Sequence, residues 1–157
     1  MKLQNAPRAK GQLLIRKPVA EVFDAFVDPA ITTKVWFTKS TGRLETGKEV
    51  RWDWEMYGVA TQVNVKAVEP NKRILIEWDD PPCPVEWLFT PRADHTTFVC
   101  ISNWGFAGTD DEQVARAIDS MGGFSLVLAG CKALLEHGVV LNLIADHNPD
   151  AYTKTGA

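Results

Sequence analysis

The residues of this chain that could act as acids, bases or metal ligands are few and scattered. Three histidines, His95, His137 and His147, are far apart in sequence, and their spacing does not match a zinc site. General acid–base catalysis needs a titratable group held in apolar surroundings, and none of the three has such a context. We expect them to be surface or capping residues.

Carboxylates alternate with apolar side chains in several segments. The outward-facing candidates are Asp53, Glu55, Glu77 and Glu86. Because neighbouring side chains of a strand point to opposite faces, Glu77 beside Trp78 and Glu86 beside Trp87 should be solvated. The sequence therefore offers no catalytic residue, and we expect that the protein is not an enzyme.

The three cysteines do not form a recognisable disulfide framework. Cys83, Cys100 and Cys131 are odd in number and widely spaced, which favours free thiols. A reactive Cys83 would need a basic neighbour to lower its pKa, and the surrounding prolines supply none.

Motifs for cofactors and charged partners are missing as well. The chain contains no G-x-S-x-G, H-E-x-x-H, C-x-x-C, G-x-G-x-x-G or P-loop pattern, so we expect no metal and no cofactor. A net charge of −3 without a basic run argues against nucleic acid and anionic membranes. No secretory signal and no run of about 18 apolar residues is present, which predicts a cytoplasmic protein.

The first elements that could position a site are a strand over residues 11–16 and two short helices. Val19, Val22, Phe23 and Phe26 follow Pro18 at helical spacing. Asp28–Pro29 ends that helix and starts a second one toward Trp36.

Residues 38–103 read as consecutive antiparallel strands. In residues 51–56, Trp52, Trp54 and Met56 alternate with polar residues, and four later segments alternate in the same way. The alternation breaks near Ala67–Val68, which suggests a bulge. The aromatic face of Trp52 and Trp54 is either part of the core or an outer partner surface, through which a homodimer could form.

Residues 110–137 form one long predicted helix that covers the apolar face of the sheet. Its expected apolar stripe is Val114, Ile118, Met121, Phe124, Leu128, Cys131 and Leu135. Gly122 and Gly123 each cost such a helix roughly 1 kcal/mol relative to alanine. We expect them to serve a close backbone approach, a kink or space for a ligand. The length fits a single domain over residues 1–157, with a core at 11–137 and a C-terminal extension at 138–157.

Dispersed motifs carry a family resemblance in the right order along the chain. They are Ile15 with Pro18, Val22-Phe23, Ala25-Phe26, Asp28-Pro29, Trp36-Phe37, Thr41-Gly42, Gly47, Val65-x-x-Val68-x-Pro70, Arg73-Ile74, Trp78, Thr96-Thr97 and Gly123-Phe124-x-x-x-Leu128-x-x-Cys131-Lys132. The chain resembles the START-like, pollen-allergen-like (SRPBCC) superfamily and, within it, the family of the C-terminal domain of the heat-shock protein 90 ATPase activator. The resemblance implies an α+β helix-grip fold, in which a curved antiparallel sheet of about six or seven strands wraps around one long C-terminal helix.

The same resemblance implies a cavity between the sheet and the long helix. The expected ligand-binding residues are Trp36, Phe37, Trp54, Val63, Trp78, Trp87, Asn103, Phe124 and Leu128. The tryptophans among them could instead be core residues, and Asn103 could bond to the backbone rather than to a ligand. Phe124 and Cys131 replace the tryptophan and leucine usual in this family, which implies a larger or differently shaped cavity. The segment 105–108 is either a flexible connection or a lid.

Three functions remain open at this point. The first is binding of a small apolar or lipid-like molecule in the cavity. The second, which the family resemblance implies, is interaction with a chaperone ATPase. The third is a polyketide cyclase-like enzyme, which would need a carboxylate, histidine or tyrosine that faces the cavity.

Overall fold

The computed structural model describes residues 2–151 of the chain. Its elements are, in order, β1 (Ala9–Ile15), α1 (Val19–Val27), α2 (Pro29–Thr32), β2 (Lys39–Ser40), β3 (Glu49–Trp54), a 3₁₀ turn η1 (Glu55–Tyr57), β4 (Val59–Glu69), β5 (Arg73–Trp78), β6 (Cys83–Pro91), β7 (Thr97–Asn103), α3 (Asp110–His137) and α4 (Leu143–His147).

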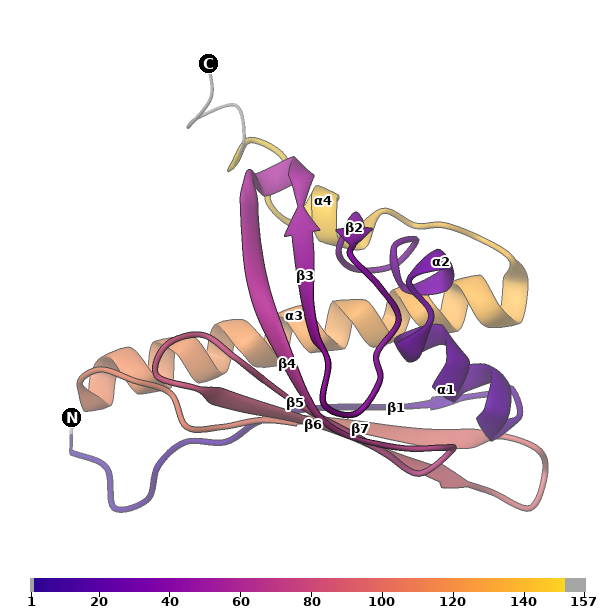
Figure 1. Ribbon diagram of the computed structural model, residues 1–157, viewed down its shortest axis with the longest axis horizontal. Helices are drawn as coiled ribbons and strands as arrows, with labels where there is room; N and C mark the ends of the chain where they lie inside the picture. Colours follow the sequence, from indigo (N-terminus) through magenta and orange to yellow (C-terminus); the bar gives the residue numbers. More distant parts are fainter. Residues whose placement is uncertain (1, 152–157) are drawn as a thin grey trace.

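The strands form one seven-stranded antiparallel sheet in the order β1-β7-β6-β5-β4-β3-β2. In Figure 1, β3 and β4 rise steeply across α3, whereas β1 and β7 run along its length. The register between β4 and β5 shifts between Val65 and Ala67, next to the bulge predicted near Ala67–Val68. The predicted α+β helix-grip fold is confirmed.

The aromatic face of β3 belongs to the core and not to an outer partner surface. Trp52 is 1% exposed, and its ring stacks on Phe37 with ring centroids 4.3 Å apart. The opposite face carries ion pairs, among them Lys66–Glu77 and Arg73–Glu86. The prediction that the carboxylates point outward is therefore confirmed for these strands.

The predicted strand over residues 51–56 is too long. β3 ends at Trp54, and Met56 lies in η1. Gly58 follows η1 with a φ of 65°, a left-handed conformation that glycine adopts without strain. The chain therefore reverses direction over η1 and Gly58, and the strand cannot continue through Met56.

The helix α3 has well-defined ends. At its start, the Thr109 hydroxyl accepts a hydrogen bond from the Glu112 N–H, while the Glu112 carboxylate accepts one from the Thr109 N–H. At its end, Gly138 has a φ of 66° and closes the helix. Both ends agree with the predicted helix over residues 110–137.

The predicted apolar stripe is wrong in the first half of α3. Ile118 is 62% exposed and Met121 is 47% exposed, whereas Ala117 occupies the buried position of that turn. The first half of α3 turns its polar residues Arg116, Asp119 and Ser120 toward the cavity and buries only the small Ala117, so the larger Ile118 and Met121 are left in solvent.

The second half of α3 supplies much of the core. Its buried residues Phe124, Val127, Leu128 and Cys131 pack with the inner face of the sheet and with α1. Length and composition alone would allow α3 to cross a membrane, but these contacts make it the central helix of the fold.

Candidate functional site

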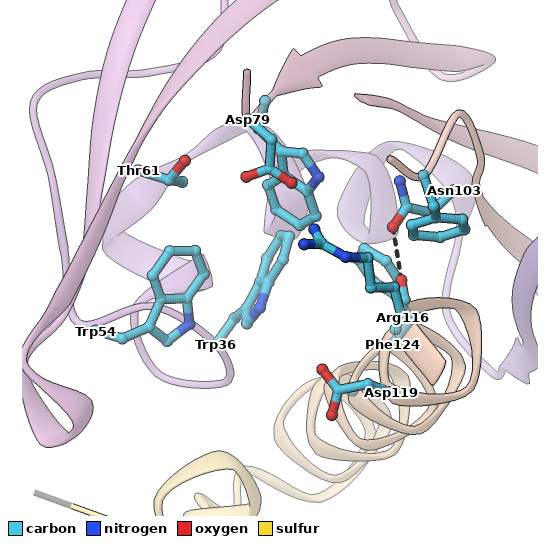
Figure 2. Close-up of a pocket in the computed structure, with 12 residues that line it drawn as sticks. Trp36, Trp54, Thr61, Asp79, Asn103, Arg116, Asp119 and Phe124 are labelled. Atoms are coloured by element: carbon cyan, nitrogen blue, oxygen red, sulfur yellow. Dashed lines mark hydrogen bonds between the residues drawn. The ribbon is translucent and has the colours of Figure 1, made fainter. Parts of the chain in front are cut away.

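A cavity of about 350 Å³ lies between the sheet and the first half of α3. Its apolar wall consists of Trp36, Trp54, Trp78, Phe106 and Phe124. Figure 2 shows the side chains of Trp36 and Trp54 on one side of it and α3 on the other. The arrangement forms a slot bounded by rings, which suits a planar or aromatic molecule.

Trp36 connects this wall to the core. It follows α2, and the Thr32 hydroxyl holds the corner between α1 and α2 by donating a 2.6 Å hydrogen bond to the Ala25 carbonyl. The Trp36 ring lies 5.6 Å from Phe124 and 5.0 Å from Trp52, measured between centroids. One face of the cavity is therefore as rigid as the core behind it.

Asn103 joins three elements at the inner end of the cavity. Its Nδ2 donates a 2.8 Å hydrogen bond to the Pro84 carbonyl, and its Oδ1 accepts a 2.7 Å hydrogen bond from the Ser120 hydroxyl, drawn as a dashed line in Figure 2. The buried Asn103 amide therefore forms its hydrogen bonds with β6 and α3. This matches the structural alternative for Asn103 more closely than a ligand-orienting role.

Cys83, beside Asn103, is not set up as a nucleophile. The residue is 4% exposed, and its thiol donates a 2.9 Å hydrogen bond to the Trp104 carbonyl. Burial raises the pKa of the Cys83 thiol, and the hydrogen bond from Asn103 offsets only part of that rise. Burial also raises the pKa of Cys131, to about 12. All three cysteines are free.

The cavity also contains charged groups that the sequence analysis missed: Arg116, Asp119 and Asp79. In Figure 2 the guanidinium of Arg116 points into the cavity toward Asp79, and Asp119 stays close to the helix. Loss of water around the Asp79 carboxyl raises its pKa, and the positive charge of Arg116 opposes this rise.

A periodic signal for the helical part of this group was present in the sequence. Arg116, Asp119, Ser120 and Gly123 fall at i, i+3, i+4 and i+7, so they form one face of α3. The sequence analysis followed the apolar stripe instead. Asp79 lies on a different element, and no sequence spacing connects it to Arg116.

The structure separates the predicted ligand-binding residues into two groups. Trp36, Trp54, Trp78, Asn103 and Phe124 line the cavity. Phe37, Val63, Trp87 and Leu128 are each at most 2% exposed and lie in the core away from it. The division depends on how far the sheet curls away from α3, which strand alternation does not reveal.

The two glycines of α3 do not mediate a close approach. A Cβ atom on Gly122 or Gly123 would meet no atom within 4 Å, and Gly123 borders the cavity. The predicted role in providing space therefore fits Gly123. The close backbone approach of this fold occurs at Gly11 instead.

The segment 105–108 contributes Phe106 to the cavity wall. Its end is held by the start of α3: Gly108 has a φ of 104°, and a side chain there would collide with Glu112. The Gln113 side chain also donates a 2.9 Å hydrogen bond to the Gly108 carbonyl.

Among residues 2–151, no cluster of three His, Cys, Asp or Glu residues could hold a metal ion.

The curved sheet, the central helix and the cavity between them define a START-like protein of the helix-grip class. The chain belongs to the family of Activator of Hsp90 ATPase homolog 1-like proteins, whose family model matches residues 16–136. No match to a curated protein was found.

Solved structures with the same fold include proteins of different origin. SSP2350 from Staphylococcus saprophyticus is 27% identical, with a TM-score of 0.75 over 86% of this chain and 96% of that chain. The Aha1 dimer from Colwellia psychrerythraea is 15% identical, with a TM-score of 0.72 over 84% and 98%. DynU16, a putative protein in the dynemicin biosynthetic locus, is 23% identical, with a TM-score of 0.73 over 85% of this chain and 48% of that chain. The last two share the fold with this chain.

Proposed function

We propose that this protein binds a small, mostly apolar molecule in the cavity beside the first half of α3. The observation that carries the proposal is the ring-lined cavity of about 350 Å³. This volume lies within the range of about 300–1,000 Å³ typical of small-molecule sites. The wall formed by Trp36, Trp78 and Phe124 is held in place by the core, so little order has to be gained on binding.

The mixed lining supports a ligand that is apolar over most of its surface and polar at one end. Aromatic rings supply the contact area, and Thr61, Arg116 and Asp119 supply polar groups at the margin. Affinity would come from the buried apolar area, and orientation from one or two polar contacts.

A thermal-shift screen tests this proposal. Purified protein is heated with fatty acids, sterols, flavonoids and aromatic acids, and a ligand at a hundred times its Kd should stabilise the fold by about 2.7 kcal/mol. In a protein of this size that corresponds to a rise in Tm of several degrees. A screen without any hit counts against the proposal.

The structure offers a cleaner control than replacement of Trp36, which also packs against the core ring of Trp52. Gly123→Leu adds four carbon atoms on the side of the cavity, where a Cβ atom meets nothing within 4 Å, and Gly122→Leu adds the same side chain at a position that does not line the cavity. Both variants should gain about 1 kcal/mol of helix stability. A hit should be lost or weakened at least tenfold in Gly123→Leu and kept in Gly122→Leu.

A second candidate function is interaction with a chaperone ATPase, and membership of the Activator of Hsp90 ATPase homolog 1-like family favours it. A pull-down with the chaperone ATPase of the same cell, and its ATPase rate with and without this protein, test the idea. Recovery of nothing at micromolar concentration and an unchanged rate would contradict it.

Sedimentation at several concentrations tests self-association, since the related Colwellia structure is a dimer.

A third candidate is an enzyme that acts through an ordered water. Asp79 and Asp119 border the cavity and could polarise such a water, and Asp79 holds a proton more readily than an ordinary aspartate. Product analysis of any ligand found in the screen tests this role. Unchanged ligand after prolonged incubation would contradict it.

A further inference from the structure

Arg116 differs from most arginines on this protein because its guanidinium forms neither an ion pair nor a hydrogen bond within residues 2–151, although its charge acts on the nearby Asp79. Four others form ion pairs with carboxylates, namely Arg8, Arg43, Arg51 and Arg73. No ion pair or hydrogen bond from Arg116 to any residue of the described range 2–151 is present, although Asp79 and Asp119 border the same cavity.

The position of this guanidinium is specific. Arg116 lines the cavity together with Gly123 and Phe124 of the same helix. Figure 2 shows its guanidinium extending beyond the helix toward the ring of Trp36. An arginine fork offers parallel N–H donors that match the two oxygens of a carboxylate. Next to an apolar wall that excludes part of the solvent, such a contact is stronger than on an open surface.

Resting on the proposed binding function, we propose that the ligand of this cavity carries a carboxylate, that Arg116 binds this group, and that the aromatic or planar body of the ligand lies against Trp36 and Phe124. Arg116 is then a specificity-determining residue that selects acids from among apolar molecules of similar shape.

The two carboxylates of the cavity must be reconciled with an anionic ligand. Asp119 stays near the helix while Arg116 extends toward the rings, so a carboxylate on the guanidinium approaches Arg116 more closely than Asp119. Asp79 faces Arg116 from the opposite side, and it gives up its charge more readily than an exposed aspartate because water is excluded around it.

Three probes of similar size separate the chemical classes: 2-naphthoic acid, 2-naphthamide and 2-naphthylmethylamine are an anion, a neutral molecule and a cation at pH 7. Their Kd values are measured by calorimetry on the full chain, for the wild type, Arg116→Gln and Asp119→Asn. Arg116 and Asp119 are exposed helix positions, so both variants should fold, and circular dichroism checks this.

We expect the wild type to bind the acid about tenfold more tightly than the amide, the range of one charge-assisted hydrogen-bonded contact. Arg116→Gln should remove this preference and leave the amide unchanged. Asp119→Asn should strengthen acid binding severalfold, because it removes a like charge.

Two results would overturn the inference, and they differ in what they imply for the cavity. Equal Kd values for acid and amide, or tighter binding of the amine, would overturn the role of Arg116 while leaving the binding function intact. Failure of all three probes, together with an empty thermal-shift screen, would overturn the binding function and this inference with it.

Discussion

Residues 124–137 of α3 are bound to β1 along their length, whereas residues 110–123 of the same helix border a cavity. In the second half, Lys132 Nζ donates a 2.8 Å hydrogen bond to the Leu14 carbonyl, and the Glu136 carboxylate accepts one of 2.8 Å from the Arg16 N–H. The first half has its apolar Ile118 in solvent and an unpaired Arg116 in the cavity.

The two halves of this regular helix therefore contribute differently to the stability of the fold. Its second half holds the fold together through buried side chains and ties to the strand backbone. Its first half buries only Ala117 and is held by a capping box and by polar contacts, among them the Ser120 hydrogen bond to Asn103. Substitutions in the two halves should therefore change different properties.

The largest effect should follow from Leu128→Ala in the second half. Leu128 is 1% exposed, and removal of its side chain should lower the free energy of unfolding by about 3 kcal/mol. The matched change Ile118→Ala in the first half removes a 62% exposed side chain and should alter stability by less than about 0.5 kcal/mol. Urea unfolding measures both, and equal losses would erase the contrast between the halves.

A similar but smaller loss should follow from Gly11→Val, at the point where β1 and α3 touch. A Cβ atom there already lies 3.2 Å from Phe124 Cβ, and the added methyl groups should cost about 1–3 kcal/mol through overpacking. Gly42→Ala is the control, because a Cβ atom on Gly42 meets nothing within 4 Å. A Gly11→Val protein as stable as the wild type would mean that the approach of β1 to α3 does not limit side-chain size.

The stability contributed by the Glu136 carboxylate, which accepts hydrogen bonds from Arg16 N–H and Lys132, should depend on pH. Burial alone would raise the pKa of Glu136, but hydrogen bonds from Arg16 N–H and Lys132, with the Lys132 charge, lower it below the ordinary 4.5. The ionised form therefore stabilises the fold above about pH 4.5, and this contribution disappears as the pH falls through the lowered pKa.

Glu136→Gln tests this contribution by comparison of unfolding in urea at pH 7 and pH 3. The variant should lose about 1 kcal/mol at pH 7 and little or nothing at pH 3. An equal loss at both pH values would assign the effect to packing instead of charge.

The smallest effect should follow from Asp79→Asn at the cavity. The folded protein holds the Asp79 proton more tightly than the unfolded chain does, so ionised Asp79 opposes folding at neutral pH. Asparagine also tolerates the φ of 67° at this position. We expect a slightly higher Tm at pH 7. We also expect tighter binding of 2-naphthoic acid, because the substitution removes a negative charge that acts on Arg116 and on the Cys83 thiol. A lower Tm would contradict this account of Asp79.

The sequence predicted the order of elements and the ends of α3 because these depend on local signals. Alternation predicted the inner faces of β3 to β7, and Asp110 and Gly138 marked the helix. The sequence could not show which side of the first half of α3 faces the sheet, and the apolar stripe was therefore placed at Ile118 instead of Ala117.

The cavity was predicted only in part for a related reason. Trp36, Trp54 and Trp78 were expected there on the basis of fold resemblance, and they line it. Trp87 alternates in the same manner but lies in the core, because the sheet leaves α3 only at one end. The position of Asp79 opposite Arg116 arises from the tertiary fold alone.

The most direct test of ligand binding beside the first half of α3 is an NMR titration of the tryptophan indole N–H signals with 2-naphthoic acid. Single Trp→Phe variants assign the signals. We expect those of Trp36, Trp54 and Trp78, which line the cavity, to shift together with one Kd, while that of Trp104, whose ring lies under the Arg8 guanidinium, stays in place. A shift of Trp104 with the three cavity signals unchanged would place the ligand elsewhere and contradict the account.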